Sequence, residues 1–134
     1  MTATEKIFVK IITPEKPFYV KEVLSVVIPA KNGPYAVLPH RAPAMKLLTA
    51  GVVSITEEKG QHKRYFVTNG VSKIRDGGCT LLVREATDAD EINVESVRKR
   101  LASFENRIAK GEPLEPMEKE TVGYLRMIAG CLAK

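Results

Sequence analysis

The side chains that most often perform catalysis or bind metals are few and scattered in this chain. Its two histidines, His40 and His62, and its two cysteines, Cys79 and Cys131, form no spacing typical of a metal site. A nucleophilic hydrolase needs a serine or cysteine on a sharp turn, and no G-x-S-x-G motif occurs. We therefore expect no metal, no catalytic residue and no enzyme activity, and we interpret both cysteines as packing residues.

Motifs that bind phosphate or cofactors are absent as well. Neither G-x-x-x-x-G-K-[ST] nor G-x-G-x-x-G occurs, and the pair Gly77-Gly78 is better explained by a β-hairpin turn. The acidic residues between Glu85 and Glu91 resemble a carboxylate cluster for metal binding or general acid chemistry. We interpret them instead as a solvated linker and helix start, where negative charge meets the positive end of a helix dipole. The sequence predicts no cofactor.

The most distinctive polar segment is His40 and Arg41, which stand between Pro39 and Pro43. Two prolines stiffen a loop and hold polar side chains outward, as a presented binding surface requires. An ordinary exposed loop with no partner has the same residue pattern. Both interpretations stay open from these residues alone.

The composition describes a folded chain of ordinary charge. Its 134 residues include 44% hydrophobic and 28% charged residues, and the net charge is +5. This length and apolar content fit one domain with a small appendage. The basic residues are spread out, the aromatic residues are few and tryptophan is absent, so we expect no nucleic-acid partner. No apolar run approaches the ~20 residues of a membrane span, so we expect no direct membrane insertion.

The pattern before Asp90 is that of short β-strands separated by turns. Ile7, Val9 and Ile11 alternate with other residues in the first strand, and prolines follow it. We expect a loop at 29–34, a turn at Asn69-Gly70 and a hairpin turn at 76–78. Many short strands at close spacing predict an antiparallel sandwich or barrel. The other candidate strands are 18–20, 23–28, 35–38, 45–49, 51–55, 64–68, 71–74 and 80–83.

The pattern after Asp90 is helical. Asn93 is a suitable N-cap, with Ile92 and Val97 placed as a hydrophobic staple, and Gly111 ends the helix. A second helix starts near Pro116. Each helix has one apolar stripe, which could face the other helix, the sandwich or another protein. The stripes are Val94, Val97, Leu101, Phe104 and Ile108 in the first helix and Val122, Leu125, Ile128 and Leu132 in the second.

The fold class we predict is mainly β plus α. Residues 1–90 form an N-terminal antiparallel β-sandwich, and residues 91–134 form a C-terminal two-helix hairpin. The run from Gly33 to Pro43 resembles the epsilon subunit of F-type ATP synthases. Weaker signatures of the same family lie at 11–15, 23–29, 47–53 and 68–71.

The resemblance implies a non-catalytic subunit of the rotary central stalk. Its sandwich binds the gamma subunit and the c-ring, and it rotates with both during ATP synthesis driven by a proton or sodium gradient. The implied location is peripheral, on the cytoplasmic face of the bacterial inner membrane, within the ATP synthase complex. The hairpin is then regulatory: in many members it contacts the alpha and beta subunits of the catalytic head and inhibits ATP hydrolysis.

Two candidate sites follow from the resemblance. The c-ring contact is expected from two adjacent loops that make one footprint, although the family often has an acidic residue in place of Pro34 and Gly-His in place of His40-Arg41. The family's nucleotide motif at the first helix is degenerate here, because Asn, Ser and Val replace its Asp, Arg and Ala, and we expect weak or no ATP binding. The candidate c-ring residues are Lys31, Asn32, Gly33, Pro34, His40 and Arg41, and those of the degenerate motif are Ile92, Asn93, Ser96 and Val97.

Two other functions remain as alternatives. A free-standing β-sandwich that binds a ligand or protein could use the hairpin as a dimerisation arm, and it would associate with itself stably and specifically. An unrecognised enzyme would reveal itself by a perturbed titratable group in a deep pocket. No sequence feature favours the enzyme.

Overall fold

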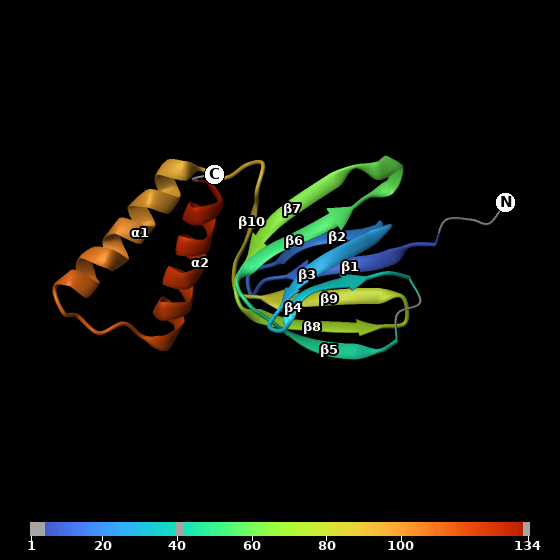
Figure 1. Ribbon diagram of the computed structural model, residues 1–134, viewed down its shortest axis with the longest axis horizontal. Coiled ribbons are helices and arrows are strands. Elements are labelled where there is room, and N and C mark those ends of the chain that lie inside the picture. The colour runs from blue at the N-terminus through green and yellow to red at the C-terminus, as the bar shows by residue number, and fades with distance from the viewer. Residues whose placement is uncertain (1–4, 40–41, 133–134) are drawn as a thin grey trace.

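The computed structural model of the chain describes residues 5–39 and 42–132. A β-sandwich is followed by two helices that lie side by side at one end of it (Figure 1). The predicted fold class is therefore confirmed. The strands are β1 (Ile7–Ile12), β2 (Pro17–Val23), β3 (Ser25–Ala30), β4 (Gly33–Val37), β5 (Ala44–Leu48), β6 (Gly51–Thr56), β7 (His62–Val67), β8 (Gly70–Arg75), β9 (Gly78–Val83) and β10 (Ala86–Asp88), and the helices are α1 (Val94–Ala109) and α2 (Pro116–Leu132).

The ten strands of the described residues form one continuous sheet. Their order is β10-β7-β6-β3-β5-β8-β9-β1-β2, with β4 paired to β3. The pairs are antiparallel apart from β1 and β9, which run parallel. A single residue pair, Ala30 with Leu48, joins β3 to β5. At this narrow joint the sheet turns from one layer of the sandwich to the other.

One apolar cluster fills the space between the layers. In β1 the predicted alternation holds, because Ile7, Val9 and Ile11 are all buried. Cys79 of β9 is buried in the same cluster, as expected of a packing residue. The prediction for Cys131 is wrong: it is exposed. It follows the buried Ile128 by three residues on the same helix face, but it stands in the last turn of α2, beyond the buried residues of that helix.

The loop predicted at 29–34 is shorter in the structure than expected. β3 continues through Pro29 and β4 begins at Gly33, so the connection is only the two-residue turn Lys31-Asn32. Pro29 and Pro34 lie opposite each other in the strand pair. Proline is tolerated there because β4 is an edge strand, so no further strand needs the missing N–H group of Pro34.

The turn predicted at Asn69-Gly70 is not a hairpin turn. β7 pairs with β6 and β10, whereas β8 pairs with β5 and β9, so Thr68 and Asn69 cross between two parts of the sheet. Gly70 already belongs to β8, and a Cβ atom there would lie 2.1 Å from the carbonyl oxygen of Leu82. Glycine is needed for close strand packing at this position. The hairpin turn expected near Asp76 is present between β8 and β9.

The acidic segment before the helices is more ordered than predicted. Residues 86–88 form β10, which pairs with β7, so the segment is not simply a solvated linker. Glu85 receives two hydrogen bonds from Arg100 of α1. Three residues are too few to show a strand period, and the partner strand lies far away in the sequence. β10 ends at Asp88, and α1 begins at Val94.

The first helix begins and ends as predicted. The side chain of Asn93 accepts a hydrogen bond from the backbone N–H of Ser96. At the other end, the N–H of Gly111 reaches the carbonyl of Ile108, and the N–H of Glu112 reaches that of Arg107. These bonds form a Schellman motif, and the positive φ of Gly111 suits glycine.

Candidate interaction surfaces

The described residues do not assemble a metal centre. No group of three His, Cys, Asp or Glu side chains within 5–39 and 42–132 could hold a metal ion. No helix in the same ranges combines the length and apolar content that a membrane span needs. The surfaces that could bind partners therefore lie on the sheet and on the hairpin.

One carboxylate is buried, and its environment is structural. Glu57, which is 4% exposed, accepts a 2.7 Å hydrogen bond from the hydroxyl of Tyr19 and a 3.3 Å contact from the ammonium of Lys21. The Tyr19 hydrogen bond holds the pKa of Glu57 below its usual value, and burial raises the pKa of Tyr19. Tyr65 packs on the Tyr19 ring at 5.2 Å. This group of side chains links β2 to the segment that follows β6.

The Lys31-Asn32 turn presents part of the predicted c-ring contact. Lys31, Asn32 and Pro34 are exposed, and Gly33 is partly exposed. The backbone N–H of Lys31 donates to the carbonyl of Leu47 at 2.9 Å, so the turn is held against β5. The structure therefore brings these four candidate residues together on one projecting turn.

A hollow of about 400 Å³ lies beside this turn. The ammonium of Lys46 sits 4.5 Å from the centre of the Tyr35 ring, within cation–π distance. The hollow thus combines two lysines with apolar side chains. Lys46 was not predicted, because only the pairing of β5 near the turn brings it there. The lining residues are Ala30, Lys31, Asn32, Gly33, Tyr35, Met45, Lys46 and Leu47.

The second predicted loop starts at the other end of β4. The turn Lys31-Asn32 precedes this strand, whereas Pro39 follows it, and the whole length of Gly33–Val37 separates the two. His40 and Arg41 lie outside the described residues. The single footprint from two adjacent loops therefore remains a prediction, and the described residues on either side of β4 do not bring the loops together.

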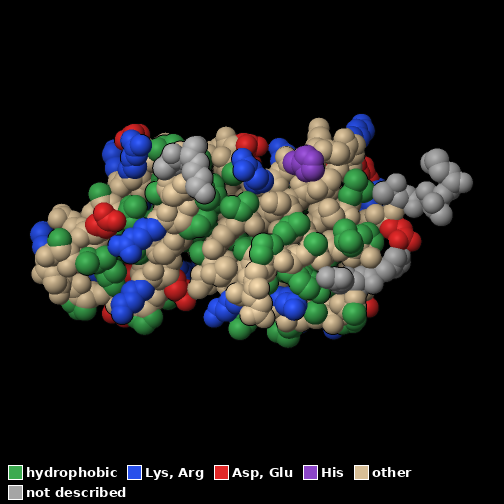
Figure 2. All heavy atoms as spheres, viewed as in Figure 1, with side chains coloured by type: hydrophobic (Ala, Val, Ile, Leu, Met, Phe, Trp, Pro, Cys, Tyr) green, Lys and Arg blue, Asp and Glu red, His purple; other side chains and the backbone are tan. Residues whose placement is uncertain are grey.

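The outer face of the sheet carries an apolar row that the sequence analysis did not single out. Leu47, Val71, Leu82 and Ile12 are neighbours on β5, β8, β9 and β1. Leu47 is 58% exposed and Leu82 is 50% exposed. Figure 2 shows hydrophobic side chains over much of the sandwich, including the lower edge where β5 lies in Figure 1. We call these four residues the outer apolar row.

Charged residues and two hollows lie next to the outer apolar row. Two positions further along the strands, Lys73 of β8 and Lys10 of β1 lie on either side of Thr80 of β9. At the β1 end of the row, Leu82 and Ile12 border a hollow of about 360 Å³. At the other end, Leu47 also lines the hollow beside the Lys31-Asn32 turn. The two surfaces are therefore continuous. Period-two alternation marks Leu47 and Leu82 as outward-facing, which was the signal available in the sequence.

The hairpin docks on the sandwich through α2. Tyr124 is 1% exposed, and its hydroxyl lies 2.8 Å from Thr87 Oγ1 and donates to the carbonyl of Phe66 at 3.3 Å. Burial raises the pKa of Tyr124 to about 12. The predicted stripe residues Leu125 and Ile128 are buried in the same cluster. The stripes therefore face both the other helix and the sandwich. Tyr124 was missed because it lies beside the predicted stripe.

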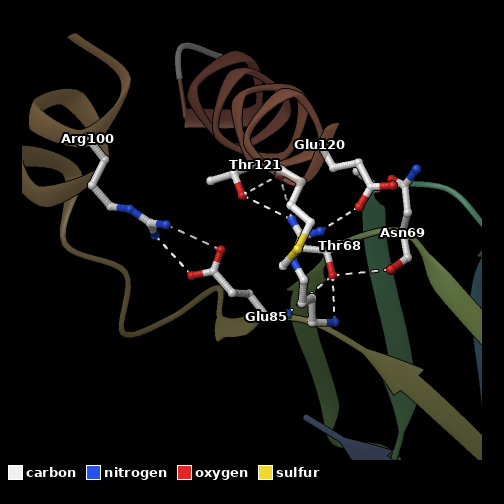
Figure 3. A network of polar contacts seen from close by, with 9 residues as sticks. Thr68, Asn69, Glu85, Arg100, Glu120 and Thr121 are labelled. Carbon is white, nitrogen blue, oxygen red and sulfur yellow. Dashed lines mark hydrogen bonds and ion pairs between the residues drawn. The ribbon is translucent and has the colours of Figure 1, made fainter. Parts of the chain in front are cut away.

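Polar contacts surround this apolar contact (Figure 3). Arg84 donates to Glu120 and to Thr121 of α2, and Glu85 accepts from Arg100 of α1. Arg84 and Glu85 both precede β10 on the sandwich side. The hairpin is thus held by charged groups as well as by packing.

The degenerate nucleotide motif lies at the start of α1. Asn93 is occupied as the helix cap, and Val97 is 7% exposed within the hairpin cluster. Ile92 packs against the same cluster, and Ser96 is exposed. A hollow of about 340 Å³ beside these residues is lined by Val94, Val97, Arg98, Ala129 and Leu132. One of its five lining side chains is cationic.

Sequence comparisons identify similar proteins over most of the chain. Residues 6–89 match the family model described as ATP synthase, Delta/Epsilon chain, beta-sandwich domain. The ATP synthase epsilon chain of Gluconacetobacter diazotrophicus is 33% identical over 106 residues, which are 79% of this chain and 75% of that protein. The epsilon chain of Rhodospirillum rubrum is 28% identical over 123 residues, 92% of this chain and 90% of that protein. Both matches are long enough to extend into the hairpin.

A structural comparison supports the same fold. A chain in the structure of the Euglena gracilis mitochondrial ATP synthase, containing OSCP, F1 and c-ring, superposes with a TM-score of 0.74. The match covers 98% of this chain and 84% of that chain at 18% sequence identity. At this identity the likeness concerns the fold, including the arrangement of sandwich and helices.

Proposed function

The chain belongs to the family of ATP synthase delta/epsilon chains, and on that premise we propose that it couples the c-ring to the gamma subunit as a non-catalytic rotor subunit of the central stalk. It acts during ATP synthesis driven by an ion gradient, at the cytoplasmic face of a bacterial inner membrane. The observation that carries the proposal is the outer apolar row. A sandwich whose core is already complete keeps a second apolar surface, which is typical of a protein-binding site.

The gamma subunit is the proposed partner of the outer apolar row. Leu47 and Leu82 each expose about half of their surface, and burying such a side chain contributes about 1 kcal/mol or more. Lys10 and Lys73 flank the row and favour a partner with carboxylates beside its apolar contact. A sandwich with a complete apolar core and paired strands forms a stiff body that is suited to transmitting torque.

The c-ring is the proposed partner of the Lys31-Asn32 turn. Lys31 and Lys46 border the hollow beside the turn, and both would meet carbonyl or acidic groups of a ring loop. The proposed contact keeps the residues expected from the resemblance: Lys31, Asn32, Gly33, Pro34, His40 and Arg41. Leu47 belongs to both surfaces. The gamma subunit and the c-ring would therefore both contact β5, as expected of a subunit that couples one to the other.

The test of both surfaces is binding of single variants to the purified gamma subunit and to the c-ring. We expect Leu82→Glu to weaken gamma binding at least about tenfold, because it places a charge in an apolar contact. Lys31→Glu should weaken c-ring binding while gamma binding is kept. Ile108→Glu is the matched control, since Ile108 is also exposed, at 43%, but lies on the hairpin. Unchanged gamma binding by Leu82→Glu would contradict the assignment of the row.

The hairpin is the proposed regulatory part, which contacts the alpha and beta subunits and slows ATP hydrolysis. An epsilon-depleted ATP synthase would be reconstituted with the full chain or with a chain that ends before Asn93. Slower hydrolysis with the full chain alone supports inhibition by the hairpin. Equal rates with both chains, when both bind gamma, would show that the hairpin does not inhibit hydrolysis. If neither chain binds gamma, the coupling function is refuted.

The start of α1 is proposed to bind ATP weakly or not at all. Ser96 stands where the family motif has a cation for phosphate, and Asn93 and Val97 are engaged in capping and packing. Calorimetry with ATP and the isolated full chain is the test. A micromolar dissociation constant would refute this part of the proposal.

A further inference from the structure

We propose that a hollow at the connected end of the two helices binds a small amphipathic anion, a carboxylate with a short alkyl chain. The connection between α1 and α2 lies at the end of the hairpin opposite to the end of α2 (Figure 1). The hollow there has a volume of about 320 Å³. Its lining residues are Ile108, Glu112, Leu114, Lys119, Val122 and Arg126. The site is separate from the two sandwich surfaces and does not rest on the proposed function.

Three of the six lining side chains are apolar, and they come from three parts of the hairpin. Ile108 belongs to α1, Leu114 to the connecting segment and Val122 to α2. Val122 is only 4% exposed, whereas Ile108 is 43% exposed and Leu114 is partly exposed. An alkyl chain in the hollow would therefore remove apolar surface of Ile108 and Leu114 from water, which favours binding. Apolar walls with a few charged groups are typical of small-molecule sites.

The charge that the hollow offers to a ligand is positive. Its one lining carboxylate, Glu112, lies 3.4 Å from Arg107, which neutralises it. In the part of the chain that the structure describes, no carboxylate lies within ion-pair distance of the Lys119 ammonium. Arg126 contacts Glu105 through Nε at 3.8 Å, which is longer than a hydrogen bond. Two cations of the lining are therefore available to an anion.

The walls of the hollow are fixed by contacts within the hairpin. Arg107 of α1 donates two hydrogen bonds to the Glu118 carboxylate of α2, at 2.5 and 3.3 Å. The same carboxylate accepts from the backbone N–H of Glu115 at 2.9 Å. These contacts join α1, the connecting segment and α2 around the hollow. A ligand would therefore lose little affinity to the ordering of the protein.

The size and the charges of the hollow define the class of ligand. Its volume lies at the lower end of the range for small-molecule sites. A polyphosphate needs many hydrogen-bond donors, whereas half of the lining side chains here are apolar. A neutral ligand would leave Lys119 without a charged partner, and a cation would be repelled. A carboxylate with about eight carbon atoms would place its charge beside Lys119 and its chain against Ile108 and Leu114.

The test is an NMR titration of the full chain with octanoate, followed through the chemical shifts of the backbone amides. We expect saturable shifts at Ile108, Leu114 and Val122, with a dissociation constant on the order of 1 mM. The amide of Leu82, in the outer apolar row, should not shift. Octan-1-ol has the same chain length without the charge, and we expect it to bind at least about fivefold more weakly.

Two pairs of variants separate the charge from the apolar wall. Lys119→Gln should weaken octanoate binding about threefold to fivefold and leave the binding of octan-1-ol unchanged. Its matched control, Lys99→Gln, removes an exposed lysine of α1 that does not line the hollow, and it should change neither ligand. Ile108→Ala should weaken both ligands about threefold, because it removes part of the apolar wall. Ile108→Leu keeps an apolar side chain of equal size and should keep both affinities.

Four results would overturn the proposal. They are octanoate shifts that do not saturate, shifts centred on the outer apolar row, equal binding of octanoate and octan-1-ol, and equal effects of Lys119→Gln and Lys99→Gln. Shifts at the same amides that follow the protein concentration without octanoate would also overturn it, because they would assign the hollow to a second copy of the chain. The gamma subunit and the c-ring are absent from the titration, so its failure would leave the proposed function unaffected.

Discussion

The sandwich and the hairpin are stabilised by different means. The sandwich has one large apolar cluster that reaches across both layers. The hairpin shares a smaller cluster with one face of the sandwich, and ion pairs surround it. Apolar burial scales with area and is insensitive to salt, whereas exposed ion pairs are weak and screened. The difference indicates a sandwich that is stable by its own core and a hairpin whose position depends on a smaller contact with it.

The largest expected effect comes from the sandwich core. Leu81 is fully buried at the centre of β9, so Leu81→Ala should lower the free energy of unfolding by about 3 kcal/mol. Urea unfolding followed by circular dichroism measures it. We expect sandwich and hairpin to lose stability together, because the hairpin needs the sandwich as its docking surface. A loss below about 1 kcal/mol would mean that the core tolerates the cavity.

The same truncation in the hairpin cluster should act locally. Leu125 is fully buried in α2, and Leu125→Ala should weaken docking by about 2 kcal/mol. Hydrogen exchange should accelerate in α1 and α2 and stay unchanged at Val9 and Leu81 of the sandwich. If hydrogen exchange accelerates equally at Val9 and Leu81, the sandwich and the hairpin unfold as one cooperative unit, which would contradict the difference between them.

A pH series separates the contribution of the buried Glu57 carboxylate to the stability of the sandwich from that of its apolar core. Tyr19→Phe removes the hydrogen bond to Glu57 and should cost about 1.5 kcal/mol at neutral pH. The pKa of Glu57 is lowered from 4.5 in the folded state, so this stabilisation is fully present above pH 4.5. It is lost as the pH falls through the folded pKa. Wild type and variant should therefore converge in acid, and a difference that is independent of pH would contradict the role of the Glu57 charge.

The smallest effect concerns the start of α1. Asn93→Ala removes the side-chain acceptor for the Ser96 N–H and should cost about 1 kcal/mol. Asn93→Ser keeps a capping oxygen and serves as the control. Exchange at the first amides of α1 measures both variants. A change in the sandwich would show that the cap is coupled to more than its own helix.

Much of the fold was predictable because its signals are local. Alternation identified β1, and the cap at Asn93 and the glycine after α1 identified the first helix. The errors occurred where a strand pairing overrides a local signal. Pro29 and Pro34 suggested a loop, but the pairing of β3 and β4 includes both prolines. β10 is too short to show a period, and only β7 makes it a strand.

The candidate surfaces were predictable only in part. The Lys31-Asn32 turn was expected from the resemblance, and the structure adds Lys46 and the hollow beside it. The outer apolar row joins residues from four strands, so no continuous segment carries its pattern. The contacts of Arg84 with α2 span 33 residues or more of sequence. Residue types alone do not reveal such distant partners.

The amino-acid sequence by itself determined most of the strands, the two helices with the cap and the end of α1, and the family. These depend on residue periods and on hydrogen bonds between near neighbours, which any folded state of the chain must satisfy. Only the tertiary structure decided which strands are neighbours, where the hairpin docks and which charged residues hold it. These arrangements depend on contacts between residues distant in sequence. Such contacts bury apolar surface, and so stabilise the fold, only once the whole sandwich has formed.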